Sequence, residues 1–529
     1  LKATKNKDVS QTIELLVNFA CSSEVLRVKE HESLNESSPE VESIFNFVIR
    51  VILSYHDASC KHVRLQVCNI ISKMLEALLQ DIRLDVSLID DVTQKMRTRL
   101  HDSSPLVRMK AVSALSRIQD PEDDNCLIIQ DYLIVLELDL NANVRRSVLS
   151  NICFTKKSLK TVFTRLYDVN PIVRKALFDR LQKGPSVKSL EIGQREKIIS
   201  AGIEEKVVDV KSSFLHVLIE IWFKGTCGSD LIMFIRLFDV EDDRDFLSTT
   251  LQYLYNNLDI NCLELCMNTI GTWIDSNTRI LSENYWNIEY VFIWCSALKY
   301  ILSNSGKCSA YYQDLIPEIS KICACLARQI DLISPGEDFI LIELFSVLRN
   351  FELNDESGRK SALDTLLQIL SKPSKFSLKA IKENVRSYVY FSINNNKILD
   401  VIVEVISEIR QPINMATPLG LEENVKLSDT EPEPLAEKTD ILLACLSIVA
   451  EVLQIRNVDL TTSRALTLLK DFILPLIQDA RPEIRIESVR CLSLFCIGVN
   501  QYVQKYLLLL FQIVNIDTVE IKNMAISAI

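Results

Sequence analysis

Lysine and arginine side chains gather in one stretch of an otherwise acidic chain. Residues 141–200 hold thirteen Lys or Arg against four Asp or Glu, whereas the 529-residue chain has a formal net charge of −11. A confined basic surplus on an acidic protein is the charge pattern of a phosphate-binding surface. The candidate residues for binding a nucleic-acid backbone are Arg145, Arg146, Lys156, Lys157, Lys160, Arg174 and Lys175.

Aromatic side chains do not alternate with these basic residues, so base stacking is not expected. We therefore expect contacts to the phosphates of a nucleic-acid backbone, independent of base sequence. The alternative is an ordinary solvated helix edge.

Motifs of enzymatic chemistry are missing from the sequence. GxGxxG, GxxxxGK, GxSxG and HExxH do not occur, and acidic pairs such as Asp242 and Asp243 are typical of solvated turns. The 15 Cys and five His show no paired ligand spacing, which favours free thiols in a reducing compartment over a metal site. The sequence predicts a non-enzymatic protein without metal or cofactor.

The composition indicates which elements must position the basic residues. Only 11 of 529 residues are glycine, and long stretches lack both Gly and Pro, which favours helices over hairpins or Rossmann units. No run approaches 18 uninterrupted apolar residues, so no membrane-spanning helix is expected. The chain begins at Leu1 and ends at Ile529 within a helical pattern, which we interpret as a fragment.

One short phrase recurs along the chain: an Asp, a polar turn, an aliphatic residue and then a basic residue. Its copies pair Asp102 with Arg108, Asp139 with Arg145, Asp168 with Arg174, Asp479 with Arg485 and Asp517 with Lys522, and looser copies end at Arg64 and Lys211. Successive basic positions from Arg64 to Lys211 lie 44, 37, 29 and 37 residues apart. A two-helix unit of about 40 residues is typical of HEAT and armadillo repeats. The predicted fold class is therefore all-α, a curved, superhelical HEAT-repeat α-solenoid.

Apolar residues after each turn fall on one helical face, as a helix that buries one side requires. We expect the Asp to cap the second helix of its repeat and to pair with the Arg of a neighbouring repeat, which would form a ladder along the array. Arg108, Arg145 and Arg174 are then structural in the first place.

Four parts are predicted along the chain. They are an N-terminal HEAT-repeat arm with the basic stretch (1–240), a degenerate helical-repeat middle (241–410), an acidic Pro-containing loop (411–440) and a truncated C-terminal HEAT-repeat arm (441–529). The polar stretch 29–42 is predicted to be a second loop.

Several segments resemble the CAP-G type HEAT-repeat subunit of condensin. The longest is RLHDSSPLVRMKAVSALSRIQDPEDD at 99–124, and others are NVRRSVLSNI at 143–152, VRKA at 173–176, RLFDVE at 236–241, GRK at 358–360 and SEIRQPI at 407–413. The segment from ILPLI at 473–477 to IK at 521–522 also matches in order. The resemblance runs from about residue 57 to the end and is weak before residue 50 and at 260–340.

The resemblance implies a regulatory subunit of condensin without ATPase activity. Such a subunit grips a segment of the kleisin subunit, reaches the SMC subunits indirectly through the kleisin, and holds double-stranded DNA in a basic groove during mitotic chromosome condensation. It implies a location in the nucleus and on mitotic chromosomes, with a cytoplasmic pool in interphase, and no membrane partner. Arg145, Arg146, Arg174 and Lys175 stand in family-like phrases, whereas Lys156, Lys157 and Lys160 match loosely.

Two other classes stay open. A HEAT-repeat transport receptor or phosphatase-type scaffold would bind cargo or a catalytic partner without stable DNA affinity. An enzyme on a helical-repeat scaffold, such as a DNA-repair glycosylase, would need a catalytic Asp or Lys in a pocket, which the sequence does not single out.

Overall fold

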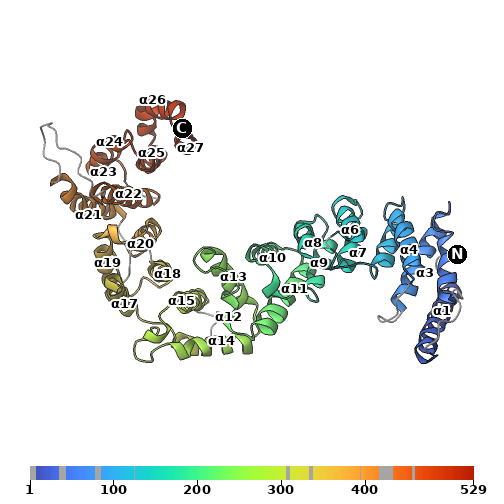
Figure 1. Ribbon diagram of the computed structural model, residues 1–529. Helices are drawn as coiled ribbons and strands as arrows, with labels where there is room; N and C mark the ends of the chain where they lie inside the picture. Colours follow the sequence, from blue (N-terminus) through green and yellow to red (C-terminus); the bar gives the residue numbers. More distant parts are fainter. Residues whose placement is uncertain are drawn as a thin grey trace. The chain divides into compact units, whose positions relative to one another are not determined.

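The chain forms an array of helices, drawn in Figure 1. The computed structural model describes residues 7–34, 43–77, 85–123, 125–304, 310–332, 338–392, 395–415, 433–455 and 459–528. It divides into two compact units, Leu1–Phe238 (unit 1) and Asp239–Ile529 (unit 2). The described residues form helices and turns, apart from one isolated bridge between Ile274 and Leu281. The predicted all-α class is confirmed.

The helices of unit 1 stack in two layers. One layer consists of α1 (Lys7–Leu34), α3 (Lys61–Ala77), α5 (Pro105–Leu115), α7 (Ala142–Asn151), α9 (Pro171–Leu181) and α11 (Val208–Leu215). The other consists of α2 (Ile44–Leu53), α4 (Val86–Arg99), α6 (Leu127–Leu138), α8 (Lys156–Val162) with the 3-10 turn η1 (Phe163–Tyr167), and α10 (Ile192–Glu204). The short segments η2 (Val187–Ser189), η3 (His216–Thr226) and α12 (Leu231–Ile235) complete the unit. Each helix packs on its partner in the chain and on the next helix of its own layer, which is the HEAT-repeat arrangement.

Helix α7 illustrates how the sequence builds a repeat. It begins after Asn141, whose side chain accepts the N–H of Asn143 and so satisfies one free donor of the first turn. Val144, Val148 and Leu149 lie on one face and are fully buried. Burial of each such side chain stabilises the fold by about 1.5–3 kcal/mol. Helix α7 is therefore held by its apolar face, and its opposite face is left for solvent.

Unit 2 has the same two-layer plan. One layer holds α13 (Arg244–Asn257), α15 (Ile288–Ser303), α18 (Phe339–Leu348), α20 (Leu378–Phe391), α22 (Glu433–Leu453), α25 (Pro482–Gly498) and α27 (Val519–Ala528). The other holds α17 (Ile319–Leu332), α19 (Glu356–Leu370), α21 (Asn395–Met415), α23 (Ser463–Thr467) with η6 (Leu468–Ile473) and α24 (Leu474–Leu476), and α26 (Asn500–Ile516). The remaining elements are α14 (Ile260–Trp273), η4 (Glu283–Tyr285), α16 (Ala310–Gln313) and η5 (Pro373–Lys375).

Both predicted loops are partly helical. Helix α21 continues to Met415 and α22 begins at Glu433, so both ends of the predicted 411–440 loop were wrong, and residues 416–432 lie outside the described part. Pro434 fits the first turn of α22 because the backbone N–H that proline lacks is not needed for helix hydrogen bonds in that turn. Helix α1 likewise runs to Leu34, into the stretch predicted as a loop from 29 to 42. The four-part division of the chain stays a prediction.

Within the described ranges, no helix combines the length and the apolar character that a membrane span requires.

Candidate nucleic-acid interface

The predicted ladder joins successive repeats of unit 1. Each basic residue of the phrase donates two hydrogen bonds to a carboxylate of the next repeat, in the two-pronged geometry that suits arginine. The rungs, with closest N–O distances of 2.6–2.7 Å, are Arg64–Asp102, Arg108–Asp139, Arg145–Asp168 and Arg174–Glu205. Their carboxylates are almost completely buried, and their guanidinium groups are largely buried.

Each rung is also tied to the backbone of its own repeat. Nη1 of Arg145 donates to the carbonyl oxygen of Asp139, six residues earlier, at 2.8 Å, and Arg174 does the same to Asp168 at 2.6 Å. The same six-residue step links Arg108 to Asp102 and, in unit 2, Arg485 to Asp479. In unit 1, each aspartate therefore accepts hydrogen bonds from the arginines of two repeats. Its carboxylate accepts from the arginine of the preceding repeat, and its backbone carbonyl oxygen accepts from the arginine six residues later.

The predicted capping role of the aspartate was wrong. Ser104, Asn141 and Asn170 occupy the N-cap positions of α5, α7 and α9. The aspartates stand two residues earlier and accept the backbone N–H of these N-cap residues, for example Asn170 N to Asp168 Oδ1 at 2.9 Å. The aspartate thus shapes the turn before the helix, while its carboxylate remains available to the ladder.

The electrostatics of a rung follow from this geometry. Burial alone would raise the pKa of Asp168, but the hydrogen bonds from Arg145 and from the Asn170 N–H, with the charges of Arg145 and Arg165, hold it below its usual value. The pKa of Glu205 is lowered first by its hydrogen bonds from Arg174. Both carboxyls are therefore ionised in the folded protein, and each rung is a charged pair.

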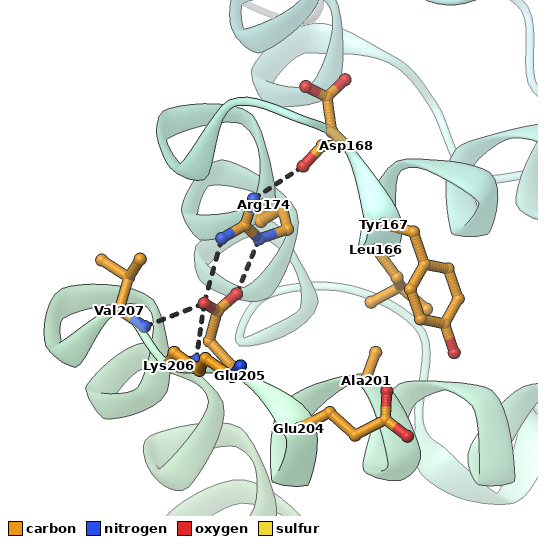
Figure 2. A pocket seen from close by; sticks show the side chains of 9 residues that line it. All are labelled: Leu166, Tyr167, Asp168, Arg174, Ala201, Glu204, Glu205, Lys206 and Val207. Carbon is orange, nitrogen blue, oxygen red and sulfur yellow. Dashed lines mark hydrogen bonds and ion pairs between the residues drawn. The ribbon is translucent and has the colours of Figure 1, made fainter.

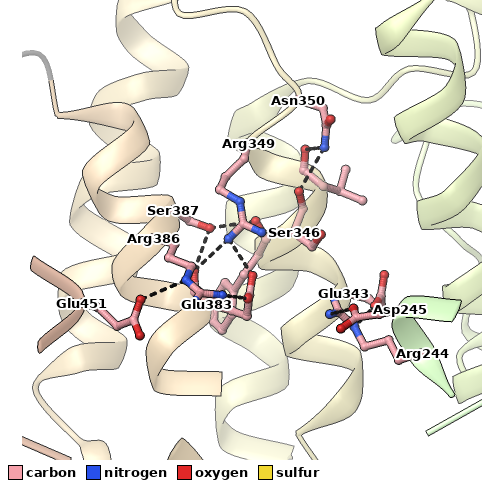
Figure 3. Close-up of polar contacts among 12 residues, drawn as sticks. Arg244, Asp245, Glu343, Ser346, Arg349, Asn350, Glu383, Arg386, Ser387 and Glu451 are labelled. Carbon is pink, nitrogen blue, oxygen red and sulfur yellow. Dashed lines mark hydrogen bonds and ion pairs between the residues drawn. The ribbon is translucent and has the colours of Figure 1, made fainter. Parts of the chain in front are cut away.

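The middle of unit 2, where no copy of the phrase occurs, holds a charge network that the sequence did not reveal. Glu343 of α18 is fully buried and pairs with Arg244 of α13 and with Lys299 of α15, the latter at 3.0 Å. Figure 3 shows the Arg244–Glu343 pair together with a second group at the end of α18 and on α20 and α22. There Glu383 pairs with Arg349 at 2.6 Å and with Arg386 at 2.7 Å.

The second group reaches further along unit 2. Arg386 pairs with Glu451 of α22 at 3.0 Å, and Glu451 also meets Arg490 of α25 at 3.4 Å. Apart from Arg386 and Glu383, which share one turn of α20, the partners lie 34 to 99 residues apart in the chain. The one available signal was a lone Glu343 inside the apolar run of α18.

The seven predicted DNA-binding residues fall into three places. Arg145 and Arg174 are committed to the ladder. Arg146, which is exposed, and Lys175, which is half-buried, follow them on α7 and α9. Lys156, Lys157 and Lys160 are exposed on α8, which belongs to the other layer, beside the turn that joins α7 to α8. The structure thus separates residues that the sequence grouped.

A packing contact adds two lysines to the group on α8. The ring of Phe154, in the turn between α7 and α8, lies so close to Gly184 that a Cβ atom there would be 2.9 Å from the ring. Arg180 stacks on the same ring at 5.0 Å and donates to the carbonyl oxygen of Ile152 at 3.3 Å. The turn between α9 and α10 is therefore packed against the turn between α7 and α8.

The second turn carries the exposed residues Lys183 and Lys188. We call the five lysines of these two turns and of α8 the basic edge: Lys156, Lys157, Lys160, Lys183 and Lys188. Within the described ranges, Lys156, Lys160, Lys183 and Lys188 form no ion pair. Sequence reasoning missed Lys183 and Lys188 because the link runs through Phe154 and Gly184, which carry no charge.

The basic edge has a limit on one side. Gln119, in the turn after α5, donates to the carbonyl oxygen of Asn151 at 2.7 Å and accepts the N–H of Cys153 at 2.9 Å. This preceding turn carries the exposed acidic residues Asp120, Glu122 and Asp123. The positive surface therefore extends over two repeats and ends at an acidic turn.

The described part of the chain holds no group of three or more His, Cys, Asp or Glu side chains that could bind a metal ion. Most of the described cysteines are buried, and burial raises the pKa of Cys68 and of Cys445 to about 12, so these thiols stay protonated.

Comparisons with known proteins point to one family. The C-terminal residues 444–529 match a family described as "Nuclear condensing complex subunits, C-term domain". Condensin complex subunit 3 of Homo sapiens is 26% identical, with 98% of this chain and 57% of the relative covered. Condensin complex subunit 3 of Saccharomyces cerevisiae is 22% identical, with 94% and 55% covered.

The fold is also similar to that of a solved structure. The crystal structure of the S. pombe condensin Cnd3–Cnd2 subcomplex matches with a TM-score of 0.77 at 20% identity, over 99% of this chain and 64% of that chain. The chain spans a little over half the length of the curated relatives. The resemblance that the repeat phrases predicted is confirmed: the chain is similar to condensin complex subunit 3 and is built as a HEAT-repeat α-solenoid.

Proposed function

We propose that this chain is a non-catalytic, regulatory part of a condensin complex that binds the kleisin subunit and the backbone of double-stranded DNA during mitotic chromosome condensation. The similarity to condensin complex subunit 3 along nearly the whole chain is the observation that carries this proposal. The related S. pombe protein was crystallised in a subcomplex with Cnd2, which supports a partner subunit for this chain too. The proposed location is the nucleus and mitotic chromosomes.

The basic edge supports the DNA part of the proposal. Its lysines are exposed point charges from two consecutive repeats, and such groups attract phosphates without reading base edges. Because the edge spans two repeats, we expect it to neutralise about four phosphates, which corresponds to a slope of about −3.6 in a plot of log affinity against log salt concentration.

The ladder changes the residues assigned to DNA. Arg145 and Arg174 already use their guanidinium N–H groups within the protein, so the proposal does not rest on them. Arg146 and Lys175 stay predictions for contacts on the other layer. Lys183 and Lys188 join Lys156, Lys157 and Lys160 as the main candidates.

The test is a titration of the chain, bound to its kleisin segment, with two unrelated duplexes over a range of salt concentrations. Replacement of Lys156, Lys157 and Lys160 by Glu is expected to weaken both duplexes equally and to flatten the salt slope. The matched control replaces Lys372, Lys375 and Lys379 by Glu, three exposed lysines of unit 2, with the same change in net charge. If both triple variants bind alike, the DNA site lies elsewhere.

The partner is tested separately, by affinity capture from a mitotic extract. Recovery of SMC and kleisin subunits supports the proposal. Recovery of transport cargo or of phosphatase subunits in their place would assign the chain to the class of transport receptors and scaffolds.

A further inference from the structure

Two neighbouring turns of unit 1 present apolar residues to solvent. Leu140, between α6 and α7, has 98% of its surface exposed, and Val169, between η1 and α9, has 96%. Both directly follow a ladder aspartate, so they occupy the same place in successive repeats. The flanking repeats have Ser103 and Lys206 at this place, which shows that the turn itself does not require an apolar residue. Leu138 and Tyr167, each one residue before the aspartate, are also exposed.

These residues border two clefts in consecutive repeats. The first cleft has a volume of about 610 Å³ and lies between Leu138 and Leu140 on one side and Tyr167 and Val169 on the other, with the Arg145–Asp168 rung among its lining residues. The second has a volume of about 310 Å³ and is lined by the Arg174–Glu205 rung, Tyr167 and Val207. Figure 2 shows the second cleft, with the ion pair facing Tyr167 across it.

The clefts are spaced for an extended peptide. Packed helices lie about 8–10 Å apart, so equivalent points of neighbouring repeats are separated by about that distance. An extended or polyproline-like chain advances about 3.1–3.3 Å per residue and covers this distance in three residues. A polyproline-like chain has three residues per turn, so two of its apolar side chains three residues apart lie on one face and would enter the two clefts together.

Charge at the cleft mouths defines the partner further. Glu137 lines the first cleft and Glu204 lines the second, and both are exposed. Neither forms an ion pair with any residue in the described ranges, in contrast to the ladder carboxylates beside them. A partner segment with Lys or Arg next to its apolar residues would complement these two carboxylates.

We propose that this turn edge binds a short extended segment of a partner protein, with two large apolar side chains three residues apart and basic residues beside them. The site lies at the opposite ends of α7 and α9 from the basic edge, because α7 begins at the first cleft and ends at the turn that carries Phe154. The proposal goes beyond the DNA and kleisin functions and does not depend on either.

The experiment is a selection of random twelve-residue peptides displayed on phage, against the chain with its kleisin segment bound. The enriched peptides are then titrated against the Leu140→Ser/Val169→Ser double variant. We expect the enriched peptides to share an apolar pair with spacing three and flanking Lys or Arg. Their affinity for the double variant should fall at least about tenfold, since burial of one large apolar side chain outweighs a tenfold change in affinity.

The controls separate folding from binding. Both residues are almost fully exposed, so the double variant is expected to melt at the wild-type temperature. A Glu137→Lys/Glu204→Lys variant should lose binding of the same peptides and keep the same melting temperature. Failure to enrich such a family, or equal binding by the variants, would overturn the proposal. If such peptides are enriched only against the chain without its kleisin segment and are released when that segment is added, the edge belongs to the kleisin. If the variants change only the oligomeric state, the edge serves self-association; either result also overturns the proposal.

Discussion

Arg145 and Arg146 are neighbours in the chain but lie in different chemical surroundings. The Arg145 guanidinium is held by Asp168 and by the Asp139 carbonyl oxygen, whereas Arg146 is exposed on the outer face of α7. The recurring phrase predicted the ladder role correctly because the six-residue step is local. Charge counting could not separate the two arginines, because burial decides which one is available to a ligand.

The Arg145→Ala variant tests the ladder. It leaves Asp168 buried without its partner, and the loss of one partner of a buried pair costs about 3–5 kcal/mol, or somewhat less where one side chain is partly exposed. We expect a clearly lower midpoint of urea unfolding for Arg145→Ala and a change below about 0.5 kcal/mol for the matched control Arg146→Ala. Equal midpoints for the two variants would contradict a structural role for the rung.

Acid should weaken the fold through carboxyls of this kind. Hydrogen bonds from Arg481 lower the pKa of Asp479 from 3.8 to about 2. A carboxyl whose pKa is lower in the folded than in the unfolded state stabilises the protein at pH values above its unfolded-state pKa. That stabilisation is lost as the pH falls through the pKa of the folded state.

The measurement is the melting temperature of the wild type and of Asp479→Asn from pH 6 down to pH 2. The difference between the two proteins should be largest near pH 6 and should shrink between the two pKa values, 3.8 and about 2. A difference that stays constant over this range would rule out the ionised Asp479 as its source.

Helix α10 shows how a single glycine can set the distance between helices. A Cβ atom on Gly202 would lie 2.2 Å from the ring of Phe214 on α11, which is fully buried. Gly193, in the first turns of the same helix, has no atom within 4 Å of such a Cβ. Packing therefore requires glycine at position 202, whereas the space around position 193 would accept a larger residue.

The two glycines provide a matched pair of variants. Gly202→Ala should destabilise unit 1 by about 1–3 kcal/mol, because it forces a methyl group into a packed contact. Gly193→Ala should stabilise it slightly, by up to about 1 kcal/mol, through better helix propensity. Thermal unfolding of both variants checks the prediction, and destabilisation of similar size in both would contradict it.

At the same scale, the sequence predicted the repeats better than it predicted the contacts between them. The phrase around Asp102, Asp139 and Asp168 marks helix pairs because the turn and the helical face are local. The network around Glu343 was missed because its partners stand on separate helices and share no phrase. The predicted set of DNA-binding residues lacked Lys183 and Lys188 for the same reason, since a packing contact between two separate turns brings these lysines to the basic edge.

For the whole molecule, stability is the sum of contacts between neighbouring repeats, since no single core unites so long an array. A partner that binds only the folded array should therefore stabilise it by mass action. We expect the kleisin segment to stabilise the chain by about 2.7 kcal/mol at a concentration one hundred times its dissociation constant. Differential scanning calorimetry over a range of kleisin concentrations checks this, and a melting temperature independent of concentration would count against the pairing.

The constant step within each rung has a consequence for how this chain can tolerate insertions and deletions. The residue whose carbonyl oxygen accepts the arginine N–H lies six residues before the arginine in every rung described, whereas the next acidic partner lies 23 to 38 residues after it. The ladder thus fixes the register of each turn but not the length of the helices between turns. Residues can be gained or lost between rungs, while a one-residue change inside the six-residue step breaks two neighbouring repeats at once.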